Sequence, residues 1–581
     1  MKKTIFISTL MAALLLSGCD DFLEPEENNT FPQDQLYKAQ YWEGILLNAY
    51  DFLPVNMSFN EDLLSDDAVT NDLGSPYISI ATGNLSAANY PHGKWNLAFE
   101  KLHYINLFLE HVDEVTWSYE SEERNRYHIQ RLKGEAYGLR AFLEFSLLKY
   151  HAGITYNGEL AGYPIIRNTM SPEDDWKLPR NALGECLDSI YADCERAIDA
   201  LPDNYQDMEF GDEVDPDYVI DYNKTFGLRF SNRINATIVK ALRSRIALFA
   251  ASPAYNPDAD ENRWQDAAAY AAGVMEMYDG IDQLTPESLT FYLKQEADEV
   301  AGVIDPEIIW KSKYSTHRIL ETSNYPPSLY GSGRINPSQN LVDAFPMENG
   351  YPITVDTATS KFDPENPWEN RDPRLSTYIL FNEGSLEGET ILTLADSSLD
   401  GVGVLETSTR SGYYLKKFMN EKVQIDPSRS MTSADHFAIY LRYTEILLNY
   451  AEAVNELYGP EGSVGSQPTA REVIGAIRAR AGITQPDDYL AGISSQEEFR
   501  NLVRNERRIE LCFENHRYWD IRRWKEMNTL TAPVRGTYLD ADTLIAYKDI
   551  EERKYQEYMI YGPIPYNEVI KYDELVQNTG Y

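Results

Sequence analysis

The chain has 581 residues, of which 43% are hydrophobic and 25% are charged. These proportions are typical of a globular protein, and the length suffices for one large domain or two closely packed ones. The formal net charge of −40 repels nucleic acid and anionic lipid headgroups, so we expect neither as a partner.

The N-terminus has the layout of a secretory signal. Lys2 and Lys3 precede an apolar run that ends on small residues at Cys19. The run is too short to cross a hydrocarbon layer of about 30 Å as a helix. Leu16-Ser17-Gly18-Cys19 resembles a bacterial lipoprotein box, although an ordinary cleaved signal with an incidental cysteine is the alternative. We therefore expect a signal peptide over 1–18, acyl chains such as palmitate on Cys19, and a polar tether over 19–32.

Residues 33–280 are predicted to be mainly helical. Apolar residues recur at helical spacing near Gln33–Phe52, Trp95–Val112, Leu132–Tyr150, Asn181–Leu201, Asn235–Ala251 and Arg263–Tyr278. A polar loop interrupts the pattern from Asn56 to Pro91. The Leu132–Tyr150 segment is apolar on two faces, so we expect other helices on both sides of it. Gly134 and Gly138 would let the backbone of a neighbouring segment approach closely.

The pattern changes over 281–436, where Pro, Gly, Ser, Asn and Tyr are frequent. Short strand-like runs stand out at Ile308–Tyr314, Thr377–Phe381 and Tyr413–Phe418, and Trp310 within the first is predicted to be a core residue. Long irregular excursions in compact proteins are usually functional or disordered, and the aromatic content argues against disorder. This stretch is the predicted ligand-binding region.

Helices return over 437–581, with predicted spans at Phe437–Tyr458, Thr469–Ala481 and Ser495–Trp524. The helix list suggests stacked, tetratricopeptide-like pairs, but no clean 34-residue repeat is visible. We expect the three regions to pack as one body.

The cysteines and histidines do not indicate a metal or disulfide framework. Cys186 and Cys194 lie on one predicted helix about 12 Å apart, too far to pair with each other. No CxxC or HExxH spacing occurs, so we expect no metal site and no cofactor. Asp258, Asp260 and Asn262 resemble the start of a calcium loop, but Arg263 and Ala269 stand where that loop needs Gly and Glu. Capping of the following helix is the better interpretation.

Three glutamates at helical spacing, Glu506, Glu510 and Glu514, could suggest the paired carboxylates of a glycoside hydrolase. Several arginines are interleaved with them, and carboxylates so surrounded stay ionised, whereas a general acid needs a raised pKa. We therefore predict a structural network of ion pairs and expect no enzymatic activity.

Several runs, in order along the chain, resemble the SusD/RagB family of outer-membrane lipoproteins. The matching runs are Lys133–Phe142 with Tyr150 and Gly162–Pro164, Arg371–Leu375, Ile477–Gly482, Glu506–Trp524, and Pro563–Pro565 through Glu568 to Gln577–Tyr581. His151 departs from the family, which often has glycine after that tyrosine. The resemblance implies a mainly α fold with tetratricopeptide-like helix pairs (a SusD-like α-α superhelix) and a loop-rich half that carries short strands.

The resemblance also implies the function. Such proteins bind glycans, or in some members peptides, at the cell surface and pass them to a SusC-like TonB-dependent transporter. We therefore expect a surface-exposed, lipid-anchored glycan-binding lipoprotein of the outer membrane, engaged in carbohydrate uptake and polysaccharide utilisation. Peptide cargo, a surface glycosidase and a helical scaffold that binds only the transporter are the alternatives.

Sugar binding requires aromatic faces for the apolar side of a pyranose, with polar side chains around them for its hydroxyl groups. Two loop segments supply both kinds of residue, and the resemblance places the ligand site of the family in corresponding regions. The predicted ligand-binding residues are Asp66, Asp67, Asn71, Tyr77 and Tyr90 in the first segment, and Tyr314, Tyr325, Tyr330, Arg334 and Asn336 in the second.

Overall fold

The computed structural model describes residues 38–211, 214–300, 305–540 and 544–581. The signal peptide, Cys19 and the tether over 19–32 lie outside these residues. Helices dominate, as predicted. Within the described residues, the strands form seven antiparallel pairs of two strands each.

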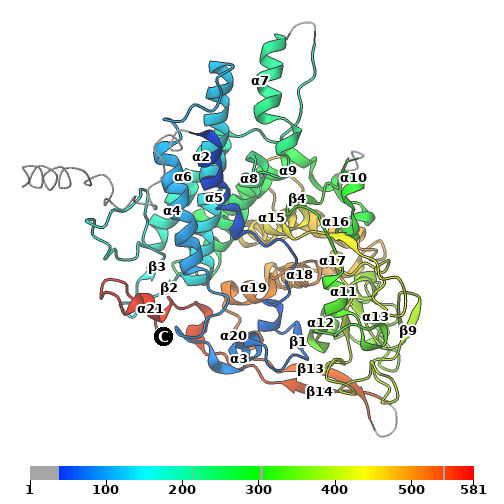
Figure 1. Cartoon of the computed structure of the whole chain (residues 1–581). Coiled ribbons are helices and arrows are strands. Elements are labelled where there is room, and N and C mark those ends of the chain that lie inside the picture. Colours follow the sequence, from blue (N-terminus) through cyan, green and yellow to red (C-terminus); the bar gives the residue numbers. More distant parts are fainter. Residues whose placement is uncertain (1–37, 212–213, 301–304, 541–543) are drawn as a thin grey trace, which may run out of the picture.

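The helical scaffold consists of helices that contact one another in series: α2 (Ala39–Leu47), α4 (Trp95–His111), α5 (Glu122–His151), α6 (Leu183–Ala200), α8 (Ala236–Ala251), α9 (Glu261–Met275), α15 (Tyr443–Tyr458), α16 (Ala470–Arg480) and α18 (Gln496–Glu510). Figure 1 shows α2, α4, α5 and α6 side by side, with α7 (Pro216–Phe226) rising away from them. The sequence pattern did not predict α7.

Helix α5 is buried on both sides, as its two apolar stripes predicted. Its glycines allow this packing, because a Cβ on Gly134 would lie 2.6 Å from Leu201, beyond α6. A Cβ on Gly138 would lie 2.9 Å from Ile234 and 3.0 Å from Val239 of α8. Trp310 is 3% exposed and belongs to the same hydrophobic core, which confirms the prediction for it.

The loop-rich half carries short helices and most of the strands, and Figure 1 shows it on the side away from α4 and α6. Its elements are α10 (Glu296–Val300), β4 (Ile308–Lys311), β5 (Ser315–His317), α11 (Ile319–Asn324), β6 (Ile335–Pro337), α12 (Gln339–Ala344), α13 (Thr357–Ser360), α14 (Pro373–Tyr378), β7 (Ile379–Leu380), β8 (Gly384–Leu386), β9 (Glu389–Ile391), β10 (Tyr414–Leu415) and β11 (Ala434–His436). A second hydrophobic core, which includes Tyr325, Tyr378 and Tyr414, lies within this half.

The remaining elements are β1 (Ala68–Thr70), α3 (Pro76–Ser79), β2 (Gly153–Ile154), β3 (Leu160–Ala161), β12 (Ile439–Arg442), α17 (Asp488–Gly492), α19 (Arg517–Trp524), α20 (Met527–Leu530), β13 (Val534–Leu539), β14 (Ile545–Glu551) and α21 (Tyr566–Val569). Nine short 3₁₀ or π segments lie between these elements in the part of the chain that the structure describes. Within the described ranges, no helix is both long and apolar enough to cross a bilayer.

Several predicted helix boundaries are wrong, and the helix predicted over Leu132–Tyr150 already begins at Glu122. The predicted helix over Phe437–Tyr458 begins only at Tyr443, because the residues before it form β12 and pair with β4. The predicted helix over Ser495–Trp524 is two helices, α18 and α19, separated by a turn. Phe513 and Asn515 in this turn have φ of +60°, which an α-helix does not allow.

Smaller expectations have mixed outcomes. Asp260 caps α9 by accepting a hydrogen bond from the Asn262 amide, as predicted. Strands occupy only parts of the three strand-like runs, and the third reduces to Tyr414–Leu415. Cys186, Cys194 and Cys512 are buried and free.

Candidate functional site

The two predicted ligand-binding segments meet because β1 pairs with β6. Val69 lies opposite Asn336, and Thr70 lies opposite Ile335. Just beyond this pairing, Asn71 accepts a hydrogen bond of 3.2 Å from Arg334 and donates one of 2.9 Å to the Ser332 carbonyl. Sequence segments more than 260 residues apart are therefore joined at one place in the fold.

Four of the predicted residues are buried, and their polar groups are engaged within the protein. Asp66 pairs with Arg508 and Arg517, and Asp67 pairs with Arg508. Burial alone would raise the pKa of Asp66, but the two guanidinium groups lower it to about 2. The Tyr325 hydroxyl donates to the Asn420 carbonyl, and the Asn336 amide group donates to the Gly333 carbonyl. In this conformation these four side chains hold loops together.

Three others are partly buried. Tyr90 donates its hydroxyl hydrogen to the Tyr150 carbonyl at 2.9 Å. Tyr314 packs edge-on against Phe437, with the Lys311 amine 4.1 Å from the centre of its ring. Tyr77 lines a cavity described below. The ligand-binding role of all these residues stays a prediction.

Tyr330 is the predicted residue that offers an accessible aromatic face, since it is 55% exposed. It has a left-handed backbone (φ +65°, ψ 15°) after the Pro326–Pro327 turn. Gly331 follows, and a Cβ there would lie 2.0 Å from the Tyr325 carbonyl oxygen, so the turn requires glycine at this position. The turn therefore fixes the tyrosine outward on a well-defined loop.

Polar side chains surround this ring. We call the space beside it the Tyr330 hollow, with a volume of about 450 Å³; its lining includes Glu387, Glu389, Thr390, Ser397, Ser398, Gln424, Asp426 and Arg429. Burial raises the pKa of Glu387, whereas hydrogen bonds from Ser428 lower that of Asp426. An aromatic face within a ring of carboxylate, amide and guanidinium groups can bind a polyhydroxylated ligand.

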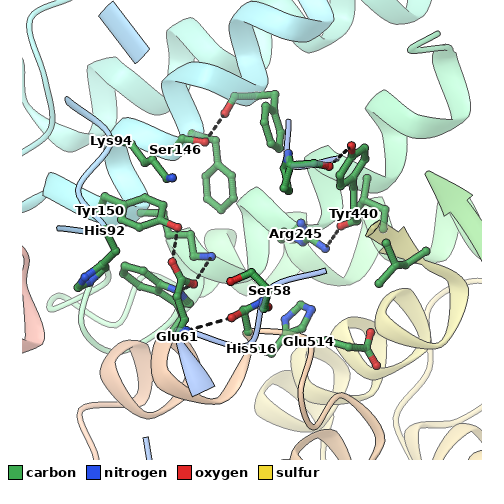
Figure 2. Close-up of a pocket in the computed structure, with 18 of the residues that line it drawn as sticks. Ser58, Glu61, His92, Lys94, Ser146, Tyr150, Arg245, Tyr440, Glu514 and His516 are labelled. Atoms are coloured by element: carbon green, nitrogen blue, oxygen red, sulfur yellow. Dashed lines mark hydrogen bonds and ion pairs between the residues drawn. The ribbon is translucent and has the colours of Figure 1, made fainter. Parts of the chain in front are cut away.

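A second space, the scaffold cavity, lies between the helical scaffold and the loops that follow α2 (Figure 2). Its volume is about 480 Å³. Phe142, Phe145, Ser146, Lys149 and Tyr150 of α5 form one wall. The other walls include Arg245 of α8, Tyr77 of α3, Ser58, Glu61, His92 and Lys94 from the N-terminal loops, Tyr440 of β12, and Glu514, His516 and Trp519 in or near α19.

Glu61 is the hydrogen-bond centre of this cavity. It accepts hydrogen bonds of 2.5 Å from the Tyr150 hydroxyl and the Trp519 indole N–H, and the Lys149 amine lies 3.9 Å away. Arg245 makes a bidentate pair with Glu445 and donates to the Tyr440 carbonyl. Burial lowers the pKa of Lys149 to about 8. Burial also lowers the pKa of His92 well below the ordinary value of a histidine.

The sequence did not predict the scaffold cavity, because its walls come from at least five separate segments. A weak signal did exist. Lys149 interrupts a largely buried stretch of α5 directly beside Tyr150. A lysine at such a position needs either an ion-pair partner or access to solvent, and here it borders a cavity.

The predicted network around Glu506, Glu510 and Glu514 is confirmed. Glu510 pairs with Arg374, Arg442 and Arg480 at 2.6–3.0 Å, and Glu514 pairs with Arg442 and Lys417. Burial alone would raise the pKa of Glu510, but the surrounding cations hold it well below its ordinary range. This carboxylate therefore stays ionised and is unsuited to serve as a general acid.

Comparisons with known proteins agree along the chain. A model of the SusD family matches residues 306–581, and a model described as "Starch-binding associating with outer membrane" matches residues 21–211. SusD-like protein P38 of Formosa agariphila is 23% identical over 559 residues, which cover 93% of this chain and 95% of that protein.

Solved structures show the same fold. A SusD-like protein from Bacteroides fragilis has a TM-score of 0.73 at 23% identity, over 95% of this chain and 99% of that one. A SusD-like carbohydrate-binding protein from the same species has a TM-score of 0.69 at 20% identity, over 93% and 99% of the two chains.

Proposed function

This chain is a SusD-like family protein, and from that premise we propose that it captures a glycan at the cell surface and delivers it to a SusC-like TonB-dependent transporter. Relatives described as starch-binding or carbohydrate-binding support a sugar ligand over a peptide. The ionised, fully paired Glu510 supports binding without hydrolysis.

The Tyr330 hollow carries the proposal for where the glycan binds. Its exposed ring can cover the apolar C–H face of a pyranose, while Glu387, Gln424 and Arg429 can bind hydroxyl groups around it. Asn71 and Arg334 would extend the site along the same turn. We thus propose that the loop-rich 281–436 region provides most of the ligand contacts.

Replacing Tyr330 with alanine is expected to weaken glycan binding by about ten-fold or more, because a stacking contact worth roughly 1 kcal/mol and its buried area are lost together. Native gels containing a panel of polysaccharides identify the ligand, and calorimetry then gives the affinity ratio. Tyr458→Ala is the matched control, since Tyr458 is 56% exposed at the end of α15. Equal affinities for the Tyr330→Ala variant and the unmodified chain would exclude the hollow as the site. Binding of peptides but no glycans would favour the alternative cargo.

Surface attachment through Cys19 gives a second test. Because Leu16–Cys19 resembles a lipoprotein box, we propose that acyl chains on Cys19 attach the protein to the outer membrane. Cys19→Ala is expected to release the protein from the outer-membrane fraction and to abolish glycan uptake by cells, while the purified variant still binds glycan. Unchanged fractionation and uptake would contradict lipid anchoring.

A further inference from the structure

The scaffold cavity has an unusual charge balance for this chain. The whole sequence has 92 acidic and 52 basic residues. The cavity lining reverses this ratio, with six Lys or Arg side chains and five Asp or Glu side chains. A local excess of cations in a strongly acidic protein needs a physical reason.

The four arginines of the lining are neutralised by protein carboxylates. Arg245 pairs with Glu445, and Arg442 pairs with Glu514. Arg507 pairs with Asp520 at 2.9 Å, and Arg523 pairs with Asp520 at 2.8 Å and with Glu452 at 2.6 Å. These pairs explain four of the six cations as parts of the structural network.

The two lysines are different. Among the described residues, Glu61 is the only carboxylate within ion-pair distance of the Lys149 amine, at 3.9 Å, and its two oxygens already accept hydrogen bonds from Tyr150 and Trp519. Among the described residues, no carboxylate lies within ion-pair distance of the Lys94 amine. Both amines lie within 6 Å of the centre of the Tyr150 ring, so both border the same part of the cavity; Figure 2 shows Lys94 beside Tyr150.

The surroundings of the two amines fit a sugar ring better than a bare ion. Aromatic side chains of Tyr150, Tyr440 and Trp519 line the space, and its volume of about 480 Å³ is in the range of small-molecule pockets. We infer that the scaffold cavity binds an acidic saccharide unit, whose carboxylate or sulfate group lies between Lys94 and Lys149. The saccharide nature of the ligand rests on the proposed function, whereas the anionic group rests on the two lysines.

Protonation of Lys149 links this binding to pH. The charged groups that face it are Glu61, Arg245, Glu445 and Asp520, with His92 and His516 nearby. Because burial lowers the pKa of Lys149 to about 8, the free cavity loses positive charge as the pH rises from 7 to 9. A bound anion favours the protonated Lys149 amine, so the affinity of the cavity for the anion should fall between pH 7 and pH 9.

Calorimetry with galacturonic acid trisaccharide, galactose 6-sulfate, inorganic sulfate and neutral cellotriose tests the inference on the complete chain. We expect an acidic saccharide to bind at least ten-fold more tightly than both cellotriose and inorganic sulfate. The better of the two acidic probes identifies carboxylate or sulfate ester as the preferred group. Equal binding of neutral and acidic probes, or binding of inorganic sulfate alone, would overturn the inference.

Substitutions then place the site. Lys149→Gln should cost at least ten-fold in affinity for the acidic probe and abolish its pH dependence between 7 and 9. Lys149→Arg should keep the affinity at pH 7 and remove the pH dependence, because a guanidinium stays protonated. Lys571→Gln is the control, since that lysine is 58% exposed and pairs with Glu568. An unchanged affinity in Lys149→Gln would refute the assignment.

The two proposals fail separately. Tyr330→Ala should leave binding of the acidic probe unchanged if the scaffold cavity is its site. The unmodified chain could bind no polysaccharide of a glycan panel and still bind the acidic probe through Lys149. That result would contradict the proposed function and leave the cavity assignment standing.

Discussion

Replacing Arg374 with alanine is expected to lower the free energy of unfolding by about 3–5 kcal/mol, the usual cost of removing one partner from a buried ion pair. Its side chain is fully buried. Its guanidinium contacts Asp372 at 2.7 Å, Glu506 at 2.5 Å and Glu510 at 2.8 Å. Alanine would leave these three buried carboxylates with less positive charge around them, and would also weaken the contact between α14 and α18.

Urea unfolding followed by tryptophan fluorescence measures this effect. Arg535→Ala is the matched control, because Arg535 also pairs with an aspartate, Asp343 at 2.5 Å, but is 38% exposed. Exposed pairs contribute about 1 kcal/mol or less, so the control should change stability little. If Arg374→Ala does not fold, Arg374→Lys is measured instead. Lysine keeps the positive charge but not the geometry of the guanidinium, so its free energy of unfolding should lie below that of Arg535→Ala. A loss below about 1 kcal/mol in Arg374→Ala would show that the network relaxes around the deletion.

The sequence predicted this network only in part. Charges at helical spacing over Glu506–Trp524 indicated ion pairs, and the observed pairs confirm that. The partners Arg374, Arg442 and Glu452 come from elsewhere in the chain, and no local pattern links them to α18 and α19. The break between these helices was also missed, because the apolar spacing continues through Phe513 while its backbone turns left-handed.

At the candidate site, too, the local sequence pattern does not reveal the contacts made with distant parts of the chain. The pairing of β1 with β6 brings the two predicted loop segments together, while their role in ligand binding stays a prediction. Which side chains are accessible depends on tertiary contacts. Asp66 and Asn336 have the polarity of sugar-binding residues, yet Arg508 and Arg517 pair with Asp66. The Asn336 side chain donates to the Gly333 carbonyl and accepts from the Arg410 amide. Tyr330 remains accessible because its left-handed turn directs it outward.

Acid should destabilise the protein through a second buried carboxylate, Glu452 of α15. It makes two hydrogen bonds of 2.6 Å with Arg523 and accepts another of 2.7 Å from the Trp524 indole. Burial alone would raise the pKa of Glu452, but Arg523, with Arg507 and Arg504, lowers it to about 2. The unfolded chain binds a proton near pH 4.3, so it holds more protons than the folded chain between these values.

The sign and size of the effect follow from this difference. The depressed pKa contributes stability that is fully present above about pH 5 and is lost as the pH falls through the folded pKa. A shift of this size corresponds to about 3 kcal/mol. Glutamine is a neutral analogue of the protonated acid, so Glu452→Gln should be about 3 kcal/mol less stable at pH 7 and should converge with the unmodified chain as the pH approaches 2.

Urea unfolding at pH 7, 5, 4 and 3 tests this convergence. Glu461→Gln is the control, because Glu461 is 71% exposed and pairs with Arg471 at the surface. Its stability curve should run parallel to that of the unmodified chain and within about 1 kcal/mol of it. Parallel curves for Glu452→Gln as well would mean that Glu452 titrates normally. Convergence would show that the charges joining α15 to α19 stabilise the fold only while they are ionised, as they are at neutral pH.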